Sequence, residues 1–269
     1  MARATANGIQ LSYEVHEEGE PVLLVCGTGQ AAYTWQFFQV SPLTAAGYQV
    51  VTFDNRGMPP SDCPPAPYTV QEMAADAAAL IEATGIGPCR VAGISLGAFI
   101  TQELALARPD LVRGAVMIGT MGRQDVFRRA IANAWLEMDG RSIELTPRFE
   151  AVMLAFTLFS PGVLCDDDRV QLFLDLTAAA PRWENPGRRG QIEADRAYDG
   201  RLEALSGISV PSMVVGFELD MLTPAVRNRE VAAAIPGCRY EEIDNCAHGG
   251  PFERPDEVNK LLLDFFAGV

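Results

Sequence analysis

Gly93-Ile94-Ser95-Leu96-Gly97 is the stretch that decides the fold, because it places a G-x-S-x-G motif between a strand and a helix. Apolar residues 89–92 before it predict the strand, and residues 98–107 after it repeat larger apolar side chains at helical spacing. A serine on such a sharp turn is held in a strained conformation, and the flanking glycines leave room for neighbouring chain. The turn lifts the hydroxyl clear of the sheet, so the motif predicts Ser95 as a nucleophile.

In this context the chain resembles the α/β-hydrolase superfamily, and within it the enol-lactonase and small-ester branch of bacterial serine hydrolases. The resemblance implies an α/β fold with a mostly parallel eight-stranded sheet, flanked by helices and carrying an inserted helical cap. It also implies a general base, an acid and an oxyanion hole, which can be sought in the remaining sequence.

The general base must be one of only two histidines. His16 ends an alternating segment that predicts an early antiparallel strand with polar side chains outward, so we interpret it as a surface residue. His248 lies in a short loop between a strand near residues 238–243 and a closing helix from about Pro255. Because the family places its base there, we predict His248 as the general base.

The acid of the triad is expected after the strand at residues 210–216. Asp220 stands four residues before Pro224, as is typical of the family, and Glu218 is the alternative. Its role is to accept the Nδ1 proton of the histidine and to stabilise the imidazolium. Ser95, Asp220 and His248 follow one another in the chain order of the superfamily.

Two backbone N–H groups are expected to form the oxyanion hole, those of Leu96 and Thr28. Thr28 lies in the loop after the strand at residues 21–26, where Cys26 replaces the histidine that relatives usually carry. Cys26 is interpreted as a small buried apolar residue, with a reactive thiol as the alternative. Gln30 is expected either to contact the substrate or to be a solvated loop amide.

Residues 54–61 resemble a further family landmark, D-x-R-G-x-G-x-S, with Pro59 where a glycine is usual. We interpret this loop as structural, with Asp54 and Arg56 holding backbone groups near the rim of the active site.

The alternation of strands and helices predicts a mostly parallel sheet that is covered on both faces. Strands are expected near residues 10–17, 21–26, 48–54, 88–94, 114–119, 210–216 and 238–243. Helices are expected near residues 32–46, 71–84, 96–108, 223–234 and 255–267. Only helical patterns remain between residues 121 and 207, and the resemblance identifies this segment as the cap, inserted into a core of residues 1–120 and 208–269.

Apolar residues at helical spacing in the segment 121–207 predict a roof over Ser95, with ordinary core packing as the alternative for any single residue. The basic residues of this segment are expected to face water: Arg123, Arg128, Arg129, Arg188 and Arg189. Because an unpaired buried charge is costly, we expect a mainly apolar substrate. The expected substrate-binding residues are Gln30, Trp35, Trp135, Met138, Met153 and Phe156, with Trp183 as a further candidate.

Bulk composition narrows the possible partners. Lys and Arg number 21 against 35 Asp and Glu, and the net charge of −14 argues against nucleic acids and anionic membranes. The first residues contain no signal-peptide pattern, so we expect a cytoplasmic protein, monomeric or homodimeric, with a small-molecule substrate. The six cysteines lack zinc-site spacing, Asp166–Asp168 are interpreted as a helix start, and no nucleotide motif is present, so no metal and no cofactor are expected.

These residues predict two-step acyl transfer, in which Ser95 attacks a carbonyl, His248 moves the proton and water then releases the acid. The expected activity is hydrolysis of an ester, lactone or related acyl bond. Relatives that keep the same triad act as cofactor-free oxygenases, C–C bond enzymes, perhydrolases or thioesterases, and these stay open as alternatives. So does a non-catalytic ligand-binding protein of the same fold.

Overall fold

Eight strands form one sheet in the order β1-β2-β4-β3-β5-β6-β7-β8, seen in the computed structural model, which describes residues 1–269. β1 and β2 pair antiparallel, as do β2 and β4, and every other pair is parallel. The strands are β1 (Ala2–Ala6), β2 (Ile9–His16), β3 (Glu20–Val25), β4 (Tyr48–Phe53), β5 (Cys89–Ile94), β6 (Val112–Ile118), β7 (Ser212–Phe217) and β8 (Arg239–Ile243). The predicted fold class is confirmed.

Helices cover both faces of this sheet because its central strands are apolar on both faces. On β3, Leu23 and Val25 belong to one core cluster, whereas Val22 and Leu24 belong to the other. The first cluster is closed by α2 (Val70–Thr84), α3 (Leu96–Ala107) and α10 (Ala225–Ala234). The second is closed by η1 (Ala32–Phe37), α1 (Val40–Ala45) and α12 (Pro255–Phe266).

Two local features differ from the elements derived by pattern. The helix expected over 32–46 is broken into η1 and α1. Strand β1 was not predicted from the pattern, because its alanines lack the bulky side chains that mark a strand. The turn Asn7-Gly8, with φ of 48° and 82°, could have indicated it, since this dipeptide favours a two-residue hairpin.

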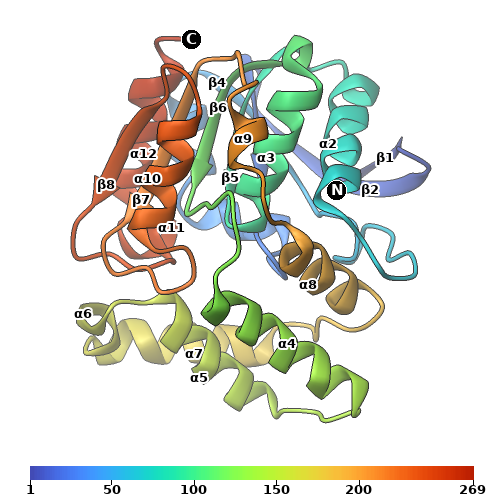
Figure 1. Cartoon of the computed structure of the whole chain (residues 1–269), viewed down its shortest axis with the longest axis vertical. Helices are drawn as coiled ribbons and strands as arrows, with labels where there is room; N and C mark the ends of the chain where they lie inside the picture. Colours follow the sequence, from blue (N-terminus) through green and yellow to red (C-terminus); the bar gives the residue numbers. More distant parts are fainter.

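The segment between β6 and β7 contains only helices, as the sequence predicts. They are α4 (Val126–Gly140), α5 (Pro147–Leu158), α6 (Pro161–Leu164), α7 (Asp167–Ala179), α8 (Gly187–Ala197) and α9 (Leu202–Leu205). Figure 1 shows α4 to α7 as a separate layer below the sheet, with α8 between that layer and the core. None of the helices combines the length and apolarity needed to cross a membrane.

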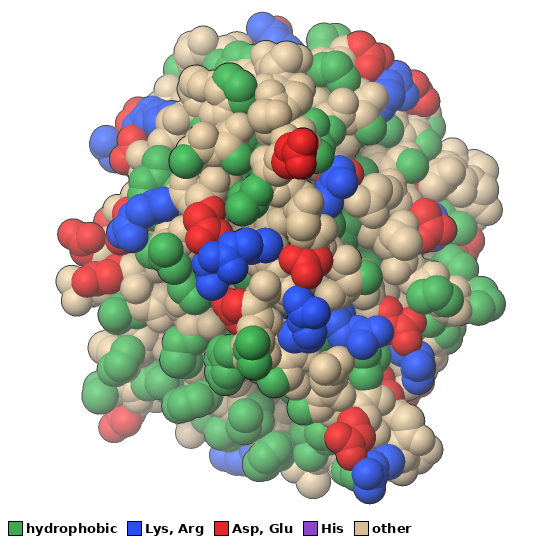
Figure 2. All heavy atoms as spheres, in the orientation of Figure 1, with side chains coloured by type: hydrophobic (Ala, Val, Ile, Leu, Met, Phe, Trp, Pro, Cys, Tyr) green, Lys and Arg blue, Asp and Glu red, His purple; other side chains and the backbone are tan.

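Apolar side chains gather on the surface of this layer (Figure 2). On α5, Phe149 and Phe156 are 50% and 58% exposed, and on α7 Leu172 and Leu176 are 62% and 56% exposed. Their helices pack mainly on each other, with Phe159 and Phe173 in edge-to-face contact at 4.8 Å. The inserted layer therefore has a small core of its own and leaves much apolar surface in contact with solvent.

Candidate active site

Ser95 lies on the turn between β5 and α3 in a strained conformation, with φ 55° and ψ −119°. A Cβ on Gly93 would lie 2.1 Å from the carbonyl oxygen of Gly97, and one on Gly97 would lie 2.2 Å from that of Val25. Both glycines of the motif are therefore required by close chain approach. The Ser95 N–H donates to the carbonyl of Ile118 at 2.9 Å, which joins the turn to the end of β6.

His248 and Asp220 meet in the loops that follow β8 and β7. The Nδ1 atom of His248 lies 2.7 Å from Oδ2 of Asp220, and both residues are buried. Burial opposes ionisation of Asp220, but the charge of His248 and hydrogen bonds from His248 and Thr223 hold the pKa of this carboxyl below its usual value. Glu218 points elsewhere, because its carboxylate accepts from the N–H of Asn245 at 2.7 Å.

The end of β6 brings the histidine and the serine to the same place. Gly119 follows Ile118, the acceptor of the Ser95 N–H, and a Cβ on Gly119 would lie 3.2 Å from Cε1 of His248. Ser95 Oγ makes no hydrogen bond to His248 in this structure. Such contacts commonly tighten only when a substrate is bound.

The loop after β3 leaves one backbone donor free beside the serine. The Gly27 N–H donates to Gln30 Oε1 at 2.8 Å, and the Gly29 N–H donates to Gln191 Oε1 at 2.9 Å. The Thr28 N–H between them has no acceptor in the protein, nor has that of Leu96 at the start of α3. Because backbone donors in protein interiors are almost always bonded, this free pair suits an oxyanion.

Gln30 is hydrogen-bonded within its own loop, and its contact with substrate stays a prediction. Its oxygen holds the Gly27 N–H, and its Nε2 donates to Thr34 Oγ1 at 2.8 Å, so this side chain braces the loop. Cys26 is fully buried, and burial raises the pKa of its thiol, which supports the apolar interpretation over the reactive one.

The loop at residues 54–61 supports the same region, as its structural interpretation requires. Asp54 accepts from the Ala32 N–H at 2.8 Å, and Asn55 donates to the carbonyl of Cys26 at 2.9 Å. Burial raises the pKa of Asp54 to about 6, against the hydrogen bond from Ala32. Arg56 binds Asp76 through two hydrogen bonds of 2.5 and 2.7 Å.

One of the expected substrate contacts needs correction. Trp35 lies in η1, is 1% exposed and packs in the core cluster between η1 and the sheet, so it is a packing residue. Met153 and Phe156 are 37% and 58% exposed, because α5 turns Ala151 and Ala155 inward, and their contact with substrate stays a prediction. Trp135 and Met138 on α4 are half-buried and stay predictions.

Trp183 is an aromatic residue of the inserted segment that reaches the loop after β3. Its Nε1 donates to the carbonyl of Gly57 at 2.8 Å. A Cβ on Gly29 would lie 2.7 Å from its ring, so the indole covers the loop next to Thr28.

Arg128 was expected to face water, which is wrong. It is 8% exposed and pairs with Asp195 on α8, with its Nη2 atom 2.5 Å from Oδ2. The pattern of α4 could not reveal this pairing, because the two residues are 67 positions apart in the chain.

Glu253 in α11 (Gly250–Glu253) is a buried carboxylate that sequence reasoning missed. It accepts from the N–H of Ala247 at 3.2 Å and from the N–H of Ser160 at 3.1 Å, and also from the Ser160 hydroxyl. Gly249 donates to the carbonyl of Leu158 at 2.7 Å. The loop that carries His248 is thus tied to the end of α5.

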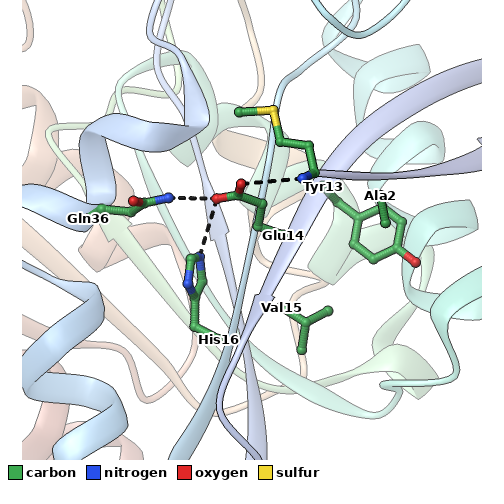
Figure 3. Close-up of a pocket in the computed structure, with 7 residues that line it drawn as sticks. Ala2, Tyr13, Glu14, Val15, His16 and Gln36 are labelled. Atoms are coloured by element: carbon green, nitrogen blue, oxygen red, sulfur yellow. Dashed lines mark hydrogen bonds and ion pairs between the residues drawn. The ribbon is translucent and has the colours of Figure 1, made fainter.

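A surface groove of about 490 Å³ lies away from these residues (Figure 3). Glu14 is at its centre, where it accepts from Gln36 Nε2 at 2.6 Å and lies 3.9 Å from His16. His16 borders this groove and belongs to no part of the Ser95 site.

Comparison with known proteins identifies the family. Residues 22–261 match the model of the alpha/beta hydrolase family, and the chain belongs to it. A Mycobacterium tuberculosis protein named "Putative non-heme bromoperoxidase BpoC" is 40% identical over 97% of this chain and 99% of its own. Its crystal structure superposes with a TM-score of 0.89 over 96% of both chains.

Two further relatives carry names of hydrolases. A protein of Azorhizobium caulinodans named "Putative carbamate hydrolase RutD" is 33% identical over 98% of both chains. The enol-lactonase from Burkholderia xenovorans LB400 is 25% identical, and its structure has a TM-score of 0.83 over 99% of this chain and 100% of that chain.

Proposed function

We propose that this protein is a serine hydrolase that cleaves an ester, lactone or related acyl bond of a mainly hydrophobic small molecule. The observation that carries the proposal is the 2.7 Å contact between Asp220 and His248, beside a serine on a strained turn. Relatives named as a carbamate hydrolase and an enol-lactonase support acyl chemistry.

In the proposed mechanism Ser95 attacks the carbonyl carbon while His248 accepts the hydroxyl proton. Asp220 accepts a hydrogen bond from the Nδ1–H group of His248. The backbone N–H groups of Leu222 and Thr223 donate to Asp220 at 2.8 Å and keep its carboxylate in place. The N–H groups of Leu96 and Thr28 stabilise the oxyanion. His248 then protonates the leaving group, and water activated by the same imidazole releases the acid and restores Ser95.

An uncharged, apolar substrate is favoured by the pairing of cations in the inserted segment. Arg128 is neutralised by Asp195, and Arg188 contacts Asp139, so neither guanidinium is free to bind a carboxylate or phosphate. We propose that the helices of residues 121–207 act as the cap, with Trp135, Met138 and Trp183 among the residues that meet the substrate.

A fluorophosphonate probe and an ester panel test the proposal. We expect one equivalent of probe on Ser95, located by peptide mass spectrometry, and the highest kcat/KM for uncharged p-nitrophenyl esters of medium or long acyl chains. Absence of labelling and of ester turnover would refute the hydrolase. Preference for short anionic esters would refute the apolar substrate while leaving the triad in place.

A second candidate function is perhydrolysis, in which hydrogen peroxide cleaves the acyl-enzyme. It is suggested by the relative named as a non-heme bromoperoxidase, which is 40% identical. In that reaction hydrogen peroxide replaces water as the attacking group on the same acyl-enzyme, and a peroxy acid leaves. Ester turnover measured with and without peroxide separates the two, because only the second candidate yields peroxy acid at the expense of the free acid.

A further inference from the structure

Two ion pairs join the same two helices of the inserted segment, one buried and one partly exposed, and only the buried pair reaches the candidate active site. Arg128 on α4 pairs with Asp195 on α8, and Asp139 on α4 pairs with Arg188 on α8. Asp195 also accepts from the hydroxyl of Thr28 at 3.2 Å, whereas no hydrogen bond links Asp139 to the loop after β3.

Helix α8 holds the loop after β3, residues 26–31, at two points; this loop is called the oxyanion loop below. Gln191 and Asp195 are four residues apart, so they lie on the same side of the helix. Gln191 accepts from the Gly29 N–H at 2.9 Å, and Asp195 accepts from Thr28 Oγ1. With Gln30 holding the Gly27 N–H, the N–H groups on both sides of Thr28 and the Thr28 hydroxyl are hydrogen-bonded, whereas the Thr28 N–H is not.

Arg128 extends this contact to the other parts of the site. Its Nη1 donates to the carbonyl of Leu222 at 3.3 Å, two residues after Asp220. Its guanidinium lies 5.7 Å from the centre of the Phe99 ring, on the helix that follows Ser95. One ion pair therefore contacts three parts of the proposed site: the loop of Thr28, the loop of Asp220 and helix α3.

A buried ion pair is a poor source of stability, because desolvation of both charges offsets their attraction. It is well suited to fixing a geometry, since its hydrogen bonds are short and directional. An oxyanion donor needs such support, because small displacements of the group weaken its contact with the transition state.

From these contacts we infer that Asp195, held by Arg128, is a positioning residue that orients the Thr28 N–H toward the oxyanion and couples the seating of the cap to catalysis. The inference rests on the proposed function, because it assigns a role within acyl transfer. It predicts a loss of kcat with little change in KM, since the donor acts on the transition state more than on the bound substrate.

The test is a double-mutant cycle of Thr28→Val and Asp195→Asn, assayed with an activated ester and corrected for active protein by the final extent of fluorophosphonate labelling. Valine keeps the shape and the backbone N–H of Thr28 but removes the hydroxyl. We expect Thr28→Val to lower kcat about tenfold, well below the roughly 10²–10³-fold cost of removing a whole donor. Thr28→Ser should restore most of the lost kcat, and adding Thr28→Val to Asp195→Asn should change kcat by less than about twofold.

Asp139→Asn is the matched control, because it breaks the other pair between α4 and α8. It should lower stability as Asp195→Asn does and leave kcat within about twofold of wild type. Unchanged kcat in Thr28→Val, multiplicative effects in the double variant, or an equal kcat loss in Asp139→Asn would each overturn the inference.

Amide hydrogen exchange of the peptide over residues 26–31 separates this inference from the proposed function. Exchange should rise several-fold in Asp195→Asn and stay at the wild-type rate in Asp139→Asn. If the wild type hydrolysed no ester, the proposed function would fail, but the exchange rates would still decide whether Asp195 orders the loop. Equal exchange in the two variants would overturn that claim.

Discussion

The core sheet and the inserted helices bury their side chains to very different degrees. In α3 all but the last two of its residues are buried, whereas α7, of similar length, buries none. The proposed reacting groups lie on loops of the core, and α8 of the inserted segment contacts the loop after β3. Rigid placement of Ser95, His248 and Asp220 is thus separated from a layer whose packing can differ without disturbing them.

Within the inserted segment the same contrast recurs on a smaller scale. Gln191 and Asp195 on α8 are buried and bonded to the loop after β3, while Phe156 and Leu172 on the outer helices face solvent. The inner part of the segment therefore supports the proposed active site, and the outer part is where shape is least constrained.

The largest effect expected of the core machinery is on turnover. Ser95→Ala should lower turnover of a p-nitrophenyl ester by roughly 10⁴–10⁶-fold, because it removes the nucleophile. The melting temperature should not fall, because the substitution removes only the hydroxyl group and no packing contact of the fold. Retention of more than a few per cent of activity would remove Ser95 from its proposed role.

A somewhat smaller loss is expected for the acid. Asp220→Asn should reduce kcat by about 10⁴-fold, because the amide favours the wrong tautomer of His248. Glu218→Gln is the control, since this side chain bonds the Asn245 N–H and not the histidine. An equal loss in both variants would mean that the loop geometry, and not the contact with His248, governs activity.

Stability should separate the core from the outer helices. Leu24 is fully buried, and Leu24→Ala should lower the free energy of unfolding by about 2–5 kcal/mol. Leu172 is 62% exposed, and Leu172→Ala should change it by less than about 0.5 kcal/mol. Urea unfolding measures both; a large loss for Leu172→Ala would show that another surface covers α7 in solution.

A pH-dependent effect is expected from a buried carboxyl group of the core loops, Asp54. The folded-state pKa of Asp54 is about 6, above its ordinary value of 3.8. Between these two pH values the folded protein therefore holds a proton that the unfolded chain has lost. This contribution to stability is present below about pH 4 and is lost as the pH rises through 6, on the order of 2–3 kcal/mol in all.

Asp54→Asn removes that pH dependence while keeping an acceptor for the Ala32 N–H. The stability of the variant relative to wild type should therefore increase between about pH 4 and 7, as measured by urea unfolding at several pH values. Asp168→Asn, on the exposed start of α7, is the control. A stability difference that did not grow with pH would contradict the buried-charge account of Asp54.

Local sequence was sufficient wherever a short-range pattern carries its own geometry. The motif around Ser95 specifies a strand, a tight turn and a helix within a dozen residues, and the structure has all three. Glycines 93 and 97 are needed by contacts that any such turn creates. Short apolar runs likewise marked seven strands, and only the alanine-rich β1 lacked the bulk to be recognised.

Only the tertiary structure decided which side chains share a space. Trp35 resembled a substrate contact and is core, because η1 turns it toward the sheet. Arg128 resembled a surface cation, yet it pairs with Asp195 under Thr28, since the docking of α4 and α8 brings together residues remote in the chain. Sequence spacing determines the periodicity of an element, but which face is buried depends on the elements packed against it, and no local pattern encodes that.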